Sequence, residues 1–122
     1  MGSHPANLIF RFLLEIAGLA SFGYWGWSVG TGWYSYLLAA GVPFVMATFW
    51  GTFAVPDDPS RSGSAPIPVP GIIRLLLELA FFAFASWSLF DTGLTVAGYI
   101  LGVLVLIHYA LSFDRVKWLF SR

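Results

Sequence analysis

Residues 33–55 of the chain read WYSYLLAAGVPFVMATFWGTFAV, a run that contains no charged side chain. A helix needs about 20 consecutive apolar residues to cross the roughly 30 Å hydrocarbon core of a bilayer. A second charge-free run of similar length covers residues 94–113. These two runs predict membrane-spanning helices, and the rest of the sequence is interpreted outward from them.

The composition of the whole chain agrees with a membrane protein. Of its 122 residues, 58% are hydrophobic and only 10% are charged, and the mean hydropathy is +0.79. Soluble domains carry about 25% charged residues, and a chain this short exposes too much surface for so few charges to cover. Six basic residues balance six acidic ones and there is no cysteine, which excludes a nucleic-acid partner, thiol catalysis and disulfides.

Two further apolar stretches bring the number of predicted spans to four. The spans are residues 6–27, 33–55, 71–90 and 94–113. The breaks between the first two and between the last two allow only tight turns, so the spans pair into two hairpins, 6–55 and 71–113. The predicted fold is therefore an all-α, polytopic four-helix membrane bundle that forms a single transmembrane domain over residues 1–122.

The segments outside the hairpins are polar. Residues 56–70 contain five prolines, which prevent a helix and predict an extended cytoplasmic linker. Residues 114–122 alternate apolar and charged side chains, as expected of an amphipathic tail that lies on the anionic cytoplasmic leaflet.

The basic residues predict the orientation of the bundle. All six fall on the side that the two termini and the linker share: Arg11, Arg61, Arg74, Arg115, Lys117 and Arg122. The opposite side carries only the acidic Asp91. Cytoplasmic segments of membrane proteins are enriched in Lys and Arg, so we expect a multi-pass protein of the cell membrane with both termini in the cytoplasm.

A short motif occurs twice. Residues 11–17, RFLLEIA, return as RLLLELA at residues 74–80. Each copy opens a hairpin, and two spans separate the copies, so both run through the membrane in the same direction. This pattern predicts a parallel internal repeat.

These segments resemble a known family. The two Arg-x-x-x-Glu segments, together with Trp50-Gly51-Thr52-Phe53 and the nearby Pro56, are similar to the YrdB-like family of bacterial membrane proteins. The likeness extends over most of the chain, and Trp-Gly-x-Phe-x-x-Pro is its most distinctive part. The family is a domain of unknown function with four predicted membrane helices, so the resemblance implies this architecture and no activity.

The repeated motif carries the main candidates for a functional site. Arg11 and Glu15, and likewise Arg74 and Glu78, are four residues apart and so lie on one helix face. Both glutamates fall roughly 10–13 Å inside the cytoplasmic end of their spans. Each such charge costs up to about 2.5–3.5 kcal/mol if it faces lipid, so we expect the four residues to form one buried polar layer. Crossed pairing of Arg11 with Glu78 and of Arg74 with Glu15 suits the repeat.

Two other side chains are added to this candidate binding site. His108 falls at a similar depth, where it either relays a proton to a glutamate or bonds to a neighbouring carbonyl or hydroxyl. Trp50 closes the second span, a position typical of an interfacial anchor. Without a second histidine nearby we expect no metal site, and no motif indicates an enzyme or a cofactor.

Three function classes follow, and for the third, an intramembrane enzyme, the chain offers no recognisable catalytic set. The first is a transporter-like bundle that binds a small solute or a proton at its Arg–Glu layer; four helices enclose little volume, so a homodimer would enclose a transport path better. The alternative is a non-catalytic membrane scaffold or accessory subunit whose ion pairs only hold the helices in register. A cavity filled with water or ligand between the charges favours the first class, and a sealed ion-pair core favours the second.

Overall fold

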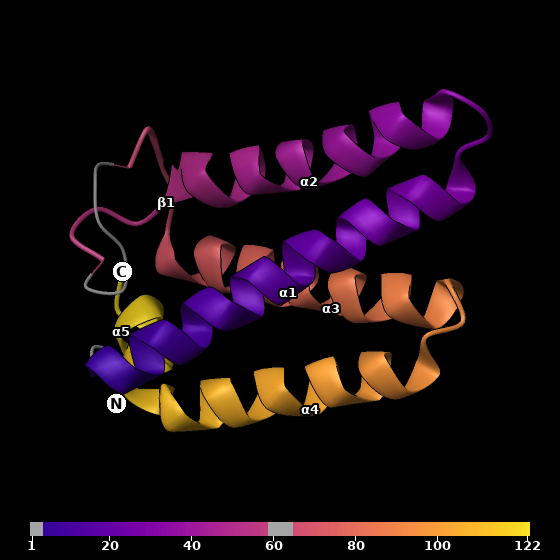
Figure 1. Cartoon of the computed structure of the whole chain (residues 1–122). Helices are drawn as coiled ribbons and strands as arrows, with labels where there is room; N and C mark the ends of the chain where they lie inside the picture. Colours follow the sequence, from indigo (N-terminus) through magenta and orange to yellow (C-terminus); the bar gives the residue numbers. More distant parts are fainter. Residues whose placement is uncertain (1–3, 59–64) are drawn as a thin grey trace.

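A computed structural model describes residues 4–58 and 65–122 of the chain. Within these residues the chain forms five helices and two very short strands (Figure 1). In chain order they are α1 (Pro5–Val29), α2 (Tyr34–Thr52), β1 (Phe53–Ala54), β2 (Ile67–Pro68), α3 (Gly71–Asp91), α4 (Thr95–Leu111) and α5 (Phe113–Phe120). The all-α prediction is confirmed, with one small strand pair added.

The four long helices form two hairpins that lie against each other. Figure 1 shows the α1–α2 and α3–α4 turns at one end of the bundle, and both chain ends, β1 and α5 at the other. Gly32 and Gly93 in the two turns adopt φ angles of +59° and +83°, which glycine reaches without steric cost. At Gly26 the two helices of the first hairpin come so close that a Cβ atom would lie 2.3 Å from the Leu38 carbonyl oxygen.

The core lies between α1, α3 and α4. Phe22 of α1 packs edge to face against Phe81 of α3, with ring centroids 5.1 Å apart, and Phe82 and Ala85 complete the centre. In contrast, Ser35 is the one buried residue of α2. Most of the surface of α2 is therefore apolar and uncovered.

Three helices, α1, α2 and α3, are long and apolar enough to cross a membrane. The fourth apolar segment divides into the 17-residue α4 and the short α5, which are bent by 70° relative to each other. The described residues therefore contain three candidate spans, or four if the bent pair counts as one. The predicted fourth span ends two residues early, at Leu111.

The tail is not a simple surface extension, because one face of α5 packs against the beginning of α3. Leu119 is fully buried, and a Cβ atom on Gly71 would lie within 1.7 Å of the Leu119 carbonyl oxygen. Glycine at the first position of α3 thus allows the backbone of α5 to pack directly on this helix.

The residues just before the linker pair with residues near its end. Phe53 pairs with Ile67, and Ala54 with Pro68, in a parallel two-strand ladder. The second helix consequently ends at Thr52 rather than at the predicted Val55. Residues 59–64, including the Arg61 used in the orientation argument, lie outside the described residues.

Candidate functional site

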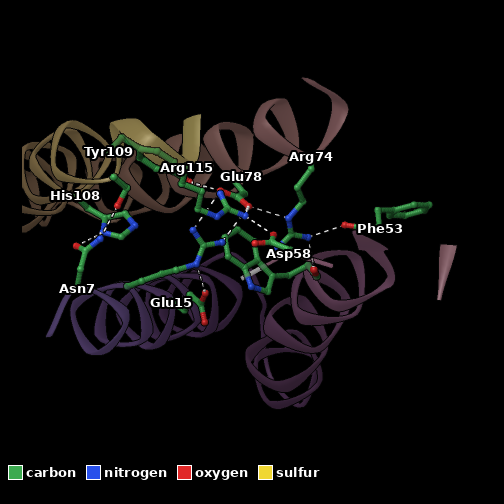
Figure 2. Close-up of polar contacts among 12 residues, drawn as sticks. Asn7, Glu15, Phe53, Asp58, Arg74, Glu78, His108, Tyr109 and Arg115 are labelled. Atoms are coloured by element: carbon green, nitrogen blue, oxygen red, sulfur yellow. Dashed lines mark hydrogen bonds and ion pairs between the residues drawn. The ribbon is translucent and has the colours of Figure 1, made fainter. Parts of the chain in front are cut away.

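Glu78 of α3 is the centre of the buried polar layer (Figure 2). Its side chain has no exposed surface, and three arginines and a tyrosine converge on its two carboxylate oxygens. Arg115 binds both oxygens, at 2.7 and 2.8 Å, and Arg11 also spans both, at 3.3 and 3.0 Å. Arg74 Nε and the Tyr109 hydroxyl each donate over 2.8 Å. Each oxygen of Glu78 thus has three protein donors.

The predicted crossed pairing is half right. Arg11 does reach from α1 across to Glu78, and its Nε also contacts Glu15, at 3.2 Å. Arg74, however, pairs with Glu78 of its own helix. The predicted Arg74–Glu15 pair is wrong, because the Arg74 side chain extends toward the end of α2 instead.

Arg74 caps the C-terminus of α2. Its Nη1 donates to the carbonyl oxygens of Trp50 and Phe53, the latter over 2.6 Å. Carbonyl groups in the last turn of a helix have no partner within the helix and carry partial negative charge, so a guanidinium is well suited to this place. One arginine therefore joins α3 to the point where α2 ends and β1 begins.

Trp50 lies against the charged groups rather than serving only as an interfacial anchor. The guanidinium carbon of Arg74 is 4.5 Å from the centre of the Trp50 ring, and that of Arg11 is 5.1 Å away. The same ring packs against Phe81 with centroids 4.5 Å apart. Trp50 thus separates the arginines from the aromatic core and adds cation–π attraction.

Two residues of the layer were not predicted from the sequence. Arg115 was assigned to the surface tail, but it is buried on the inner face of α5, and its Nη2 also donates to Asp58 over 2.6 Å. Asp58, in the linker, is buried as well. Neither residue belongs to the repeated motif, and the bend before α5 brings Arg115 inside, so no local pattern marks them.

With these additions the formal charges of the layer cancel. Its three guanidiniums and three carboxylates belong to Arg11, Arg74, Arg115, Glu15, Asp58 and Glu78. Five of the six side chains are buried, whereas that of Glu15 keeps 23% of its surface exposed. Buried charges in a membrane protein require such pairing.

His108 lies beside the layer and bonds elsewhere. Its Nδ1 is 3.2 Å from the Asn7 Oδ1, and Asn7 Nδ2 donates to Ser112 Oγ over 2.6 Å. Phe10 packs edge-on against the imidazole. His108 therefore bonds to a neighbouring side-chain carbonyl, the second of the two expectations, and does not contact a glutamate directly.

Two apolar grooves lie between helices of the bundle. One of about 530 Å³ lies between α3 and α4 and includes Ala83, Ser86, Gly98 and Gly102 in its lining. Another of about 230 Å³ lies between α2 and α3 beside Trp50. In residues 4–58 and 65–122, no three His, Cys, Asp or Glu side chains are grouped so as to hold a metal ion.

Comparisons with known proteins show the family of the chain and name no activity. The model of a family described as "Protein of unknown function (DUF2568)" matches residues 9–106. The chain is 40% identical over 119 residues to the "Uncharacterized protein YrdB" of Bacillus subtilis (strain 168), across 98% of this chain and 97% of that protein. No solved structure matches. The resemblance that the motifs indicated is confirmed, and the chain belongs to the DUF2568 family of proteins of unknown function.

Proposed function

We propose that the chain is a multi-pass protein of the cell membrane whose charged layer is a structural lock, and that it acts as a non-catalytic scaffold or accessory subunit. The observation that carries this proposal is the enclosure of Glu78. A carboxylate that binds a solute or releases a proton during transport needs a free lone pair or a mobile partner. Both oxygens of Glu78 are instead held by donors from α1, α3, α4 and α5.

The arginines are also held from their other side. The second partners are Glu15 for Arg11, two backbone carbonyls for Arg74 and Asp58 for Arg115. To free Glu78, several of these contacts must break together, and leaving one buried charge without its partner costs about 3–5 kcal/mol. These energetics favour a fixed arrangement over a site that opens in each cycle.

The orientation that we propose places both termini and the linker in the cytoplasm. Both chain ends and β1 lie at one end of the bundle (Figure 1), which is also the end of the charged layer. Large aromatic residues, including the exposed Trp33 and Tyr34, lie at the other end, as is common where helices meet the membrane surface.

A scaffold needs a surface for its partner, and α2 offers one. Among its exposed apolar side chains are Leu37, Phe44 and Phe49. Because α2 is held mainly by α1, its outer face is free to pack against lipid or against another membrane protein. We expect the partner to be another membrane protein, because this outer face belongs to the apolar helix α2.

A transporter-like function remains the second candidate, and the partial exposure of Glu15 is the observation that favours it. Its side chain is 23% exposed, and Arg11 is its one ion-pair partner among the residues that the structure describes. An incompletely enclosed carboxylate within a membrane helix is a reasonable place to bind a proton.

Flux measurements separate the two candidates. Purified protein is reconstituted into liposomes that contain a pH-sensitive dye, and a proton gradient is imposed with and without a panel of small solutes. The scaffold proposal predicts the same flux as in protein-free liposomes. A flux that is present in the wild type and lost in a folded Glu15→Gln variant contradicts it and supports transport.

A second experiment searches for the partner that the scaffold proposal requires. A photocrosslinking amino acid replaces Phe44 in living cells. We expect a discrete adduct with one membrane protein, and no such adduct from the matched, equally exposed position Val96 on α4. Adducts with lipid alone from both positions would contradict the scaffold role.

A further inference from the structure

Helix α5 exposes two large phenyl rings at the end of the bundle that holds both chain ends (Figure 1). Phe113 is 56% exposed and Phe120 is 64% exposed. These are the first and last of the eight residues of α5, so they are about two turns apart. Both rings therefore lie on one side of the helix, the phenyl flank, and the network around Glu78 uses neither of them.

The inner face of α5 is fixed to the rest of the protein. Arg115 and Leu119 share this face, and both are buried. Leu119 packs on Gly71 at the beginning of α3, while Arg115 binds Glu78 and Asp58. The helix cannot turn about its axis to hide the phenyl rings, because Arg115 would then leave its carboxylates. The exposure of the phenyl flank is thus a property of the docked helix.

The outward side of α5 also carries a polar flank. Asp114, Lys117 and Ser121 are exposed, and their spacing of three and four residues places them on one side of the helix. Lys117 lies at the border of the two flanks, with its Nζ 5.0 Å from the centre of the Phe113 ring. The helix therefore has three distinct sides, one against the protein, one apolar and one polar.

The bend before α5 gives this helix the direction of an interfacial helix. It is bent by 70° relative to α4, so where α4 crosses a membrane, α5 runs nearly along the membrane surface. The apolar surface continues around the bend, because the exposed Leu106, Ile107 and Leu111 of α4 are followed by Phe113. Helices with an apolar and a polar side lie in the membrane plane, with the apolar side about 5–10 Å into the boundary of headgroups and acyl chains.

Phospholipid provides the two chemistries that the outward side of α5 requires. Acyl carbons suit the phenyl rings, and phosphate oxygens suit the ammonium group of Lys117 at the border. The exposed charges of the helix, Asp114 and Lys117, cancel, so apolar contact rather than net charge favours the membrane. Lipid that covers the exposed face of α4 also reaches the phenyl flank, because the two surfaces are continuous.

We propose that the phenyl flank of α5, Phe113 and Phe120, is embedded among the phospholipids at the membrane surface, with Lys117 at the level of the phosphates. This inference rests on the membrane placement that the proposed function includes. Arg115, on the inner face of the same helix, binds Glu78. The helix thus connects the membrane surface to the charged layer.

Spin-label accessibility tests the proposal on the full chain in nanodiscs of phosphatidylcholine alone. Because the chain has no cysteine, single cysteines carry the label. The positions are Phe120→Cys on the phenyl flank, its neighbour Ser121→Cys on the polar flank, and Leu106→Cys on α4. Oxygen, which concentrates in hydrocarbon, and a water-soluble nickel chelate each relax the label according to its accessibility. If Phe120→Cys does not fold, Phe113→Cys takes its place.

We expect the ratio of oxygen to nickel accessibility at Phe120→Cys to exceed that at Ser121→Cys at least about threefold, because an apolar flank lies below the headgroups. Equal ratios at these two positions, with a high ratio at Leu106→Cys, overturn the inference and leave the membrane placement intact. A Phe120→Cys label shielded from both reagents shows that protein covers the flank, which also overturns the inference. A low ratio at Leu106→Cys contradicts the membrane placement itself.

Discussion

Glu15 and Glu78 occupy equivalent places in the two copies of the repeated motif, yet they have different environments. Glu78 is fully enclosed and accepts from three arginines and a tyrosine, whereas Glu15 is 23% exposed and bonds to the Nε of Arg11. The difference arises because Glu78 lies on the buried face of α3, whereas Glu15 lies at the edge of the buried face of α1. Sequence equivalence therefore does not imply energetic equivalence.

A matched pair of substitutions tests this difference. Glu78→Gln should lower the free energy of unfolding by about 3–5 kcal/mol, because it leaves buried guanidiniums without their shared anion. Glu15→Gln should cost less than about 1 kcal/mol, since Arg11 keeps Glu78 and a partly exposed pair contributes little. Unfolding by SDS titration from mild detergent measures both, and equal losses would contradict the assignment of Glu78 as the centre.

At the same scale, the sequence predicts part of the site for a clear reason. The depth of Arg11 and Glu78 in their spans and the cost of charges in lipid are properties of the sequence alone, and they correctly indicate a contact between them. Arg115 could not be found in this way, because its neighbours alternate charged and apolar side chains as a surface helix does. Its burial depends on the bend before α5, a tertiary feature.

At the scale of elements, the packing of α5 on α3 depends on the missing side chain of Gly71. A Cβ atom there would come within 1.7 Å of a backbone oxygen of α5, and backbone cannot move aside as a flexible side chain does. Gly41, in the exposed part of α2, has open space where its Cβ would lie. The two positions thus form a natural comparison.

Gly71→Ala should displace α5 and cost about 1–3 kcal/mol, the usual range for overpacking. Gly41→Ala should be neutral or slightly stabilising, because alanine is the better helix former. Thermal unfolding in detergent measures stability, and backbone amide shifts in α5 report its displacement. An unchanged α5 spectrum in folded Gly71→Ala protein would be the contrary result.

The helix boundaries were predictable where local chemistry decides them. Gly32 and Gly93 mark the two tight turns, and Pro70 marks the start of α3. The early end of α2 was not predictable from local sequence, because Phe53 and Ala54 are apolar like the helix before them. They leave the helix to pair with residues 67–68 and to supply a carbonyl to Arg74, both of which are distant in sequence.

At the scale of the whole molecule, one end of the bundle holds the chain ends, the charged layer and α5, while the other holds the two tight turns (Figure 1). The basic residues of the sequence were assigned to this same end, and they are the basis of the proposed cytoplasmic location. The duplication of the hairpin stays a prediction from the seven-residue match.

The proposed orientation is directly testable because the chain has no cysteine. Single cysteines are introduced at Thr31, in the exposed α1–α2 turn, and at Ser121, next to the C-terminus. A membrane-impermeant thiol reagent applied to intact cells should label Thr31→Cys and leave Ser121→Cys unlabelled until the cells are opened. The reverse pattern would place the termini outside and remove the basis for the depth argument.

The central claim is that Glu78 is the shared buried anion that locks α5 to α3, and a double-mutant cycle with Arg115 tests it most directly. Unfolding free energies are measured by SDS titration for wild type, Glu78→Gln, Arg115→Met and the double variant, all in one detergent. The account predicts that the double variant loses less than the sum of the single losses, with a coupling of at least about 1.5 kcal/mol. Losses that add to within about 0.5 kcal/mol would show that the two residues act independently, and would contradict the lock.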